Sequence, residues 1–301
     1  MKKHLSTILI LMMFLVGLSV LLYPAISAYV NSRNASRMVY DYKRAIRNSS
    51  QEVLDNIYSE AQAYNERLAQ DPSAFYIPER VDGYWDALDI IGNGVMGSIV
   101  IDKIHVELPI YHGTDKGVLQ VGAGHLEGTS LPVGGEGTHC VISGHRGLPS
   151  ARLFTDLDQL EIGDTFRLET LDRTLTYSVD QVLVVLPTDS SALMPIPGED
   201  HCTLVTCTPY GINSHRLLVR GIRTEEGSKP VAVKPSKTVR TVETITYKGV
   251  TIRGDALRID PMIVAPFVAA PMLLLLLVVT IIQNVRETRR IRRTRTDENS
   301  Q

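Results

Sequence analysis

Two long stretches without a charged side chain constrain this chain more than any other feature of its sequence. Residues 5–23 read LSTILILMMFLVGLSVLLY, and residues 261–285 contain five consecutive leucines. Each stretch is long enough to supply the roughly 20 apolar residues that a helix needs to cross a bilayer. We therefore interpret both as membrane-spanning segments and expect a domain between them.

The charges that flank these stretches predict their orientation. Lys2 and Lys3 precede the first stretch, and the basic run RETRRIRRTR (residues 286–295) follows the second. Because positive charge stays on the cytoplasmic side, both termini are expected inside and the intervening residues outside the cell membrane. One alternative is a cleavable signal peptide, since Ala25, Ile26 and Ser27 form a small-x-small triplet. The basic tail is expected to contact lipid head groups, and no nucleic-acid partner is predicted.

The intervening part begins with a helical pattern and continues with short strands. Val53, Ile57, Ala61, Tyr64 and Leu68 form one apolar stripe, which predicts a helix within residues 36–70. Short apolar runs separated by glycine and proline follow from residue 97, and they indicate a mainly β domain, either a barrel or a sandwich. The expected organisation is an anchor or signal at 1–30, a helical stalk and loop at 31–90, the β domain at 91–225, a linker at 226–258, a transmembrane helix at 259–285 and a cytoplasmic tail at 286–301.

Cys207 is the candidate for chemistry, because it stands where the strand-like run TLVTC meets the turn TPYG. A buried structural thiol is the plain alternative, since free cysteine is among the most buried residue types. A nucleophilic cysteine needs a base or a positive neighbour. His201 lies six residues upstream, about 20 Å along a strand, and is too far away.

Two other positions supply better partners for Cys207. His145 follows the strand-like run HCVIS and stands, like Cys207, where a strand meets a loop. His215 and Arg216 are adjacent in the next strand, so only one of them can share the face of Cys207. If His145 is the base, Arg216 is the natural third member, because its charge and rigid fork of donors suit an oxyanion.

These residues together resemble the sortase family. TLVTC, SGHRG 62 residues earlier and Arg216 nine residues later match the family's cysteine, histidine and arginine motifs, and the likeness covers roughly residues 90–223. TCTPYG, GTSLPVGG and the C-terminal apolar stretch resemble class C, the pilin-polymerising branch. The resemblance implies an eight-stranded closed sortase-type β-barrel, with an N-terminal helical segment and two transmembrane helices, on the outer face of a Gram-positive cell.

The resemblance also implies an activity and roles for particular residues. Cys207 would be the nucleophile, His145 the acid/base and Arg216 the oxyanion stabiliser of a transpeptidase. Such an enzyme cleaves an LPxTG-like sorting signal of a pilin or surface protein through a thioacyl intermediate and forms an isopeptide bond to a lysine. Thr206, His125 and Tyr210 are expected to bind substrate or shape the site. No cofactor and no metal are expected.

Class C sortases carry a lid, and this chain departs from the family's pattern there. Asp71 and Pro72 match the start of the lid motif, but the aromatic residue, Phe75, comes two positions late. Whether Phe75 closes over Cys207 therefore stays an open question. Trp85 is a weaker substitute for the lid aromatic and is expected to pack at the edge of the barrel.

The spacing of the cysteines gives a further expectation. Cys140 precedes His145 by five residues, and Cys202 precedes Cys207 by five. If parallel neighbouring strands bring His145 and Cys207 together, Cys140 and Cys202 are near neighbours, with Cα atoms below about 7 Å apart. We expect two buried thiols there and no disulfide.

Two alternatives to a pilin polymerase are kept. One is a housekeeping sortase that attaches surface proteins to cell-wall peptide. The other is a membrane-tethered adhesion module in which Cys207 belongs only to the core.

Overall fold

The computed structural model describes residues 2–224, the segments 244–247 and 250–253, and scattered positions between 269 and 289. The chain divides into two compact units, one made of residues 1–28 and 257–301 and the other of residues 29–256. The predicted linker 226–258, transmembrane helix 259–285 and tail 286–301 lie largely outside the described residues.

The first apolar stretch is part of a long helix, α1 (Lys2–Asn48). Within it, Leu11–Asn48 is the one helical segment among the described residues that is long and apolar enough to cross a membrane, judged by length and composition. The structure thus supplies one candidate span where the sequence predicts two, because most of the second apolar stretch is outside the described residues.

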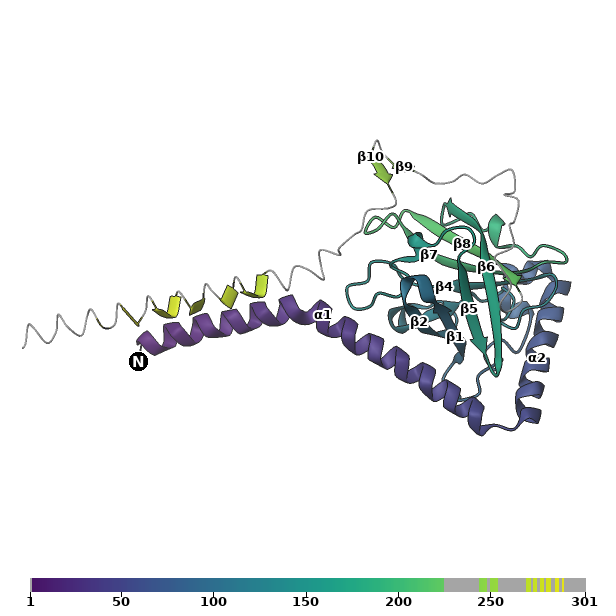
Figure 1. Ribbon diagram of the computed structural model, residues 1–301, viewed down its shortest axis with the longest axis horizontal. Helices are drawn as coiled ribbons and strands as arrows, with labels where there is room; N and C mark the ends of the chain where they lie inside the picture. The colour runs from purple at the N-terminus through teal and green to yellow at the C-terminus, as the bar shows by residue number, and fades with distance from the viewer. Residues whose placement is uncertain are drawn as a thin grey trace, which may run out of the picture. The chain divides into compact units, whose positions relative to one another are not determined.

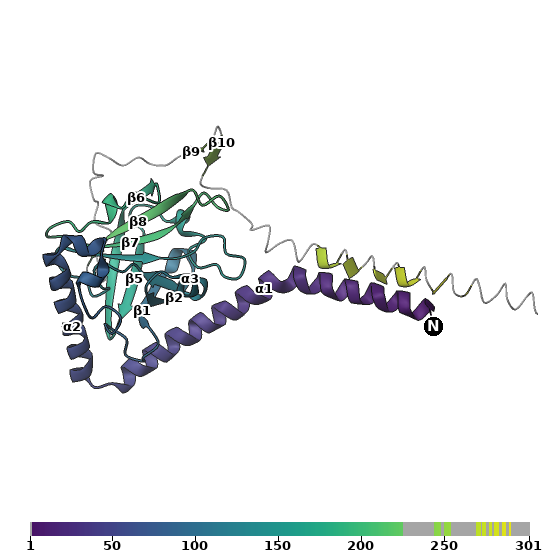
Figure 2. The ribbon, with the colours of Figure 1, turned by 180° about the vertical axis from the view of Figure 1, so that it is seen from behind.

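Eight strands close into a barrel (Figures 1 and 2). Around the barrel their order is β1-β2-β3-β4-β7-β8-β6-β5, and β2–β3 and β4–β7 are its parallel pairs. The strands are β1 (Val95–Ile101), β2 (Val106–His112), β3 (Ala123–His125), β4 (Thr138–Ser143), β5 (Thr165–Thr170), β6 (Arg173–Val185), β7 (Asp200–Thr208) and β8 (His215–Thr224). The closed eight-stranded barrel expected from the sequence is confirmed.

Short helical turns and one separate hairpin complete the described elements. They are α3 (Lys116–Val121), the 3-10 turns η1 (Pro72–Phe75), η2 (Pro78–Arg80), η3 (Asp102–Ile104), η4 (Leu157–Gln159) and η5 (Ser191–Leu193), and the antiparallel pair β9 (Thr244–Tyr247) and β10 (Val250–Arg253).

The predicted helix within residues 36–70 is two helices with a break between them. α1 ends at Asn48, and α2 (Gln51–Gln70) begins after Ser50, whose side chain accepts a hydrogen bond from the backbone N–H of Val53. Within α2, Ala61, Tyr64 and Leu68 are buried as the predicted stripe requires, whereas Val53 is 45% exposed and Leu54 beside it is buried. Hydrophobic burial of this face packs α2 against the barrel.

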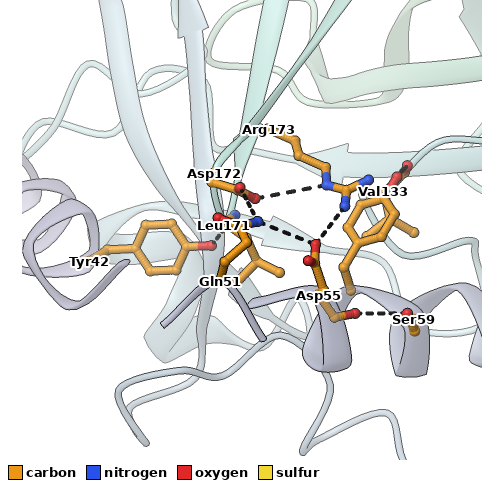
Figure 3. Close-up of polar contacts among 9 residues, drawn as sticks. Tyr42, Gln51, Asp55, Ser59, Val133, Leu171, Asp172 and Arg173 are labelled. Atoms are coloured by element: carbon orange, nitrogen blue, oxygen red, sulfur yellow. Dashed lines mark hydrogen bonds and ion pairs between the residues drawn. The ribbon is translucent and has the colours of Figure 1, made fainter. Parts of the chain in front are cut away.

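Polar contacts fix both helices to the turn between β5 and β6 (Figure 3). The buried hydroxyl of Tyr42 in α1 donates to the carbonyl of Met96 at 3.1 Å and accepts from the N–H of Leu171 at 2.8 Å. Asp55 in α2 pairs with Arg173 at 3.1 Å. Because Tyr42 satisfies two buried backbone groups at once, it anchors the end of α1 to the barrel.

Candidate active site

The pairing of β7 with β8 places Arg216 directly opposite Cys207. The two residues are register partners in an antiparallel pair, and Thr208 pairs with His215 in the same way. Partners in a sheet project their side chains from the same face, and neighbours along a strand project them from opposite faces. Of the two residues left open by the sequence, Arg216 therefore shares the face of Cys207 and His215 does not.

The pairing of β4 with β7 brings His145 to the same end of the barrel. The parallel register runs from Thr138 opposite Asp200 to Ser143 opposite Val205. Gly144 continues it by donating its N–H to the carbonyl of Val205 at 3.0 Å. His145 lies two residues beyond Ser143, as Cys207 lies two residues beyond Val205, so both stand at this end of the paired strands. His145 is partly buried, and burial lowers the pKa of its imidazole.

Cys207 projects from the outer face of the barrel. In the last residues of β7, Leu204, Thr206 and Thr208 are buried, while Val205 and Cys207 are partly exposed. Leu204 belongs to the main barrel core, whereas Val205 belongs to a separate cluster. A partly exposed thiol at a strand end is reachable by a peptide, which a buried thiol is not.

The separate cluster forms an apolar surface beside Cys207, which we term the outer apolar patch. It consists of the buried Val141, Leu193 and Leu218 and the partly buried Leu126, Leu183, Val185, Ala192 and Val205. Phe75 of η1 packs against it. The patch follows the outward-facing positions of the strands that carry the site, so it is an apolar track that leads towards Cys207.

Thr206 and Tyr210 contact the loop that carries His145. The Thr206 hydroxyl donates to the carbonyl of Gly144 at 2.7 Å. The ring of Tyr210 lies so close to Gly147 that a Cβ atom there would stand 3.1 Å from it, and Gly147 has a φ of 73°. Both residues thus support the loop from the face opposite to Cys207.

His125 lies elsewhere in the barrel. The sequence places it in a loop near the site, but it is the last residue of β3 and is fully buried. Its ring nitrogens contact the Tyr84 hydroxyl at 3.0 Å and the Ser130 carbonyl at 2.8 Å. Its register partner on β4 is Ile142, a residue of the barrel core, so His125 points into the barrel, away from the outer face of Cys207. The three-residue strand that places it there is too short to be recognised in the sequence.

Cys140 and Cys202 are near neighbours, as their spacing predicts. They are register partners in the parallel pair β4–β7, where adjacent strands lie about 4.8 Å apart. Both are free thiols, 2% and 0% exposed. Burial raises the pKa of Cys202 well above its ordinary value, which suits an unreactive structural thiol.

The segment from Asp71 to Arg80, which we term the lid segment, is held by its own contacts. Asp71 accepts from Arg80 Nε at 2.6 Å, and Arg216 has no part in this ion pair. Ala74 is fully buried, and a Cβ atom on Gly128 would stand 2.8 Å from its carbonyl oxygen. Trp85 is 58% exposed and packs edge-on against Tyr84 at the barrel, as expected of it.

One buried side chain at the site has no counterpart among the predicted residues. Arg146, next to His145, is 5% exposed and contacts Asp158 of η4 and Thr208 of β7. In the sequence Arg146 stands between His145 and Gly147 and resembles a surface cation. Its contacts with η4 and with the end of β7, which are distant in sequence, reveal its burial.

The arrangement suits attack by a thiol on a carbonyl. A partly exposed Cys207, an imidazole just beyond the end of the neighbouring strand β4 and a guanidinium opposite the cysteine on β8 combine a nucleophile, an acid/base and an oxyanion stabiliser. All three positions are set by the barrel strands β4, β7 and β8.

Comparisons with known proteins agree with this geometry. Residues 99–224 match the family model described as Sortase domain. The solved structure of sortase C1 from Streptococcus agalactiae is 45% identical, with a TM-score of 0.58, and the similarity covers 63% of this chain and 98% of that one. Sortase C of Streptococcus pneumoniae, described with its pilin substrate specificity, is 43% identical, with a TM-score of 0.57 and coverage of 63% and 97%.

Similarity to curated relatives is more distant. Sortase D of Bacillus subtilis (strain 168) is 33% identical over 130 residues, which cover 42% of this chain and 63% of the relative. The chain thus spans about three fifths of the length of that relative.

Proposed function

The chain belongs to the sortase family of cysteine transpeptidases, and we propose that it polymerises pilins by cleaving an LPxTG-like sorting signal and joining the product to a lysine. The observation that carries this proposal is the outward face shared by Cys207 and Arg216, with His145 two residues beyond the end of the adjacent strand β4. The similarity to class C sortases, one of them described with its pilin substrate, supports the choice of substrate.

The first half of the proposed reaction forms a thioester. The Cys207 thiolate attacks the carbonyl carbon of the signal's threonine, so that an S–C bond forms. The Thr–Gly C–N bond then breaks, and His145 gives a proton to the departing amine. Arg216 stabilises the negative charge that develops on the carbonyl oxygen.

The second half transfers the acyl group. The side-chain amine of a lysine on the next pilin attacks the thioester carbon, the C–S bond breaks and an isopeptide bond forms. His145 takes the proton from the attacking amine. A site that excludes water favours attack by the amine over hydrolysis.

We further propose that the enzyme is anchored in the cell membrane with its barrel outside and both termini in the cytoplasm. The apolar helical segment within Leu11–Asn48 and the basic residues at both ends of the chain support this topology.

The lid segment is proposed to cover the substrate track at rest. Phe75 packs on the outer apolar patch, which extends to Val205, two residues before Cys207 on the same face. A sorting signal with apolar residues would compete for this surface. Asp71 pairs with Arg80 and not with Arg216. The lid segment would therefore be held over the track by Phe75 and the buried Ala74.

The proposal is tested with the full chain in detergent micelles and a pilin that carries the sorting signal. Wild type is expected to form a covalent ladder, Cys207→Ala none, and Arg216→Lys about 100-fold less, because lysine lacks the rigid fork of donors. Arg152→Lys is the matched control, since Arg152 is 68% exposed in its pair with Asp156.

Two outcomes would favour the alternatives. Absence of a ladder together with attachment of the pilin to cell-wall peptide would indicate a housekeeping sortase. Failure of Cys207 to react with a charged methanethiosulfonate, while Cys140 and Cys202 are also inert, would indicate a non-catalytic adhesion module.

A further inference from the structure

Arg146 is a charged residue in the interior of the site. Its side chain is 5% exposed, and it forms an ion pair with the carboxylate of Asp158 in η4. Its Nη1 donates to the hydroxyl of Thr208 at 3.3 Å. Its Nε is buried and makes no hydrogen bond to any described residue.

The two partners of Arg146 lie on segments that the site must hold together. Thr208 is the last residue of β7 and follows Cys207 directly. Arg146 itself follows His145 directly. The guanidinium therefore connects the neighbour of the proposed acid/base to the neighbour of the proposed nucleophile.

This connection is one of three along the same edge. Thr206 donates to the carbonyl of Gly144, Thr208 accepts from Arg146, and the Tyr210 ring covers Gly147. Alternate residues around Cys207 thus hold the loop around His145. The Arg146 contact also reaches a third segment, η4, through Asp158.

Stability alone does not account for such an arrangement. Burying a guanidinium is costly, and a buried ion pair is often no more stable than apolar residues of the same volume. An arginine fork that reaches two partners nevertheless fixes their relative position, because its donors are rigid and planar.

We propose that Arg146 is a positioning residue of the transpeptidation reaction, which sets the place of His145 relative to Cys207 by joining the His145 loop to Thr208 and Asp158. The inference rests on the proposed roles of Cys207 and His145. A displacement of about 1 Å of a catalytic group costs roughly 100-fold in rate.

Three substitutions test this role in the full chain in detergent micelles, with a quenched LPxTG peptide and an amine acceptor. Arg146→Met removes both contacts and is expected to lower kcat roughly 10- to 100-fold, with KM changed less than about twofold. Arg146→Lys keeps the charge but lacks the fork, so it is expected to restore part of kcat. Thr208→Val removes one hydrogen bond from the charged guanidinium at constant shape, and we expect a loss of about three- to tenfold.

A second readout does not depend on turnover. Burial lowers the pKa of His145, so a loop released by Arg146→Met is expected to move that pKa up towards its ordinary value. NMR titration of labelled histidine measures it, and His145→Gln assigns the signal. Arg152→Met, which removes an exposed arginine of the same loop, is expected to change neither kcat nor the titration.

The outcomes separate this inference from the proposed function. If wild type turns over the peptide, an unchanged kcat and an unchanged His145 titration in Arg146→Met would overturn the positioning role alone. If wild type does not turn over the peptide, the proposed function fails and the titration still decides whether Arg146 sets the environment of His145. If Arg146→Met does not fold, Thr208→Val, Arg146→Lys and the double variant test the positioning role instead. If the loss in kcat of the double variant equals the product of the two single losses, Arg146 and Thr208 act independently and the proposed connection is contradicted.

Discussion

Among the single residues, Thr206 shows how a side chain that faces away from Cys207 still serves the site. Its hydroxyl is 2.7 Å from the carbonyl of Gly144, and the residue is 2% exposed. The hydrogen bond ties the strand of the proposed nucleophile to the loop of the proposed acid/base. A buried hydrogen bond of this kind contributes about 1 kcal/mol.

Thr206→Val is therefore expected to lower the unfolding free energy by about 1 kcal/mol. It is also expected to lower kcat, since the Gly144 carbonyl loses a donor and the loop shifts. Thr206→Ser keeps the hydroxyl and should retain most of both quantities. Chemical unfolding and peptide turnover measure them, and the idea fails if the valine and serine variants behave alike.

The residues that the sequence identified have a common physical basis. Cys207, Arg216 and His145 stand on or directly after regular strands, where alternation and register follow from spacing. Arg146 escaped notice because its burial depends on η4 and the end of β7, which are distant in sequence. His125 was misplaced because β3 has three residues and gives no alternating pattern.

At the scale of elements, the lid segment and its surface are the regulatory part of the proposal. Phe75 occupies the outer apolar patch although it stands two residues later than the family's aromatic. The 3-10 turn η1, which begins at Pro72, brings it there. The sequence could not predict this, because one 3-10 turn changes which side of the segment faces the barrel.

Phe75→Ala is expected to accelerate labelling of Cys207 by a charged methanethiosulfonate several-fold, because the lid segment loses its apolar contact with the patch. Peptide cleavage should rise in parallel. Trp85→Ala is the matched control, since Trp85 is an exposed aromatic that packs on Tyr84. Unchanged labelling and cleavage rates in Phe75→Ala would eliminate the lid.

The helices show a second limit of sequence patterns at this scale. The apolar stripe of α2 was predicted, but the break before it was not, because Ser50 interrupts the helix and caps the new one. The spacing of apolar residues does not distinguish a serine that caps a helix from a serine inside one. The contacts of Tyr42 and Asp55 with the barrel hold the two helices on either side of the break.

At the scale of the whole barrel, histidines on its outer face are buried because the connection between β6 and β7 covers them, as the contact of His139 with the Met194 carbonyl shows. His139 and His201 are register partners on β4 and β7, with ring centroids 5.6 Å apart. The Nδ1 of His139 lies 3.1 Å from the Met194 carbonyl, and its Nε2 lies 2.7 Å from the Thr203 hydroxyl. The buried ring thus has a polar partner at each nitrogen.

The charges around the two histidines oppose one another, because the Arg220 guanidinium disfavours a protonated ring and the nearby carboxylates favour one. Arg220 binds Asp180 through two contacts of 3.1 Å, and Glu199 lies 3.2 Å from His201. Burial, with the nearby Arg220 charge, lowers the pKa of both histidines to about 4. Their ordinary value is about 6.5.

The barrel is therefore expected to lose stability in mild acid. Between pH 6.5 and about 4 the unfolded chain binds protons at His139 and His201 that the folded chain does not bind. The free energy of unfolding therefore falls as the pH drops through this window, and above it the two histidines cause no loss. Each histidine accounts for about 2 kcal/mol between pH 7.5 and pH 5. Denaturant unfolding followed by the fluorescence of Trp85, the single tryptophan, measures the loss.

A matched pair of variants isolates this term from the carboxylates, which also titrate in acid. His139→Gln keeps a donor and an acceptor but cannot be protonated, so it should reduce the loss between pH 7.5 and pH 5 by about 2 kcal/mol. His105→Asn replaces an exposed histidine with a residue that tolerates its φ of 53°, and it should leave the loss unchanged. An equal acid sensitivity in all three proteins would mean that the buried histidines do not set the pH dependence, and that the carboxylates of the barrel do.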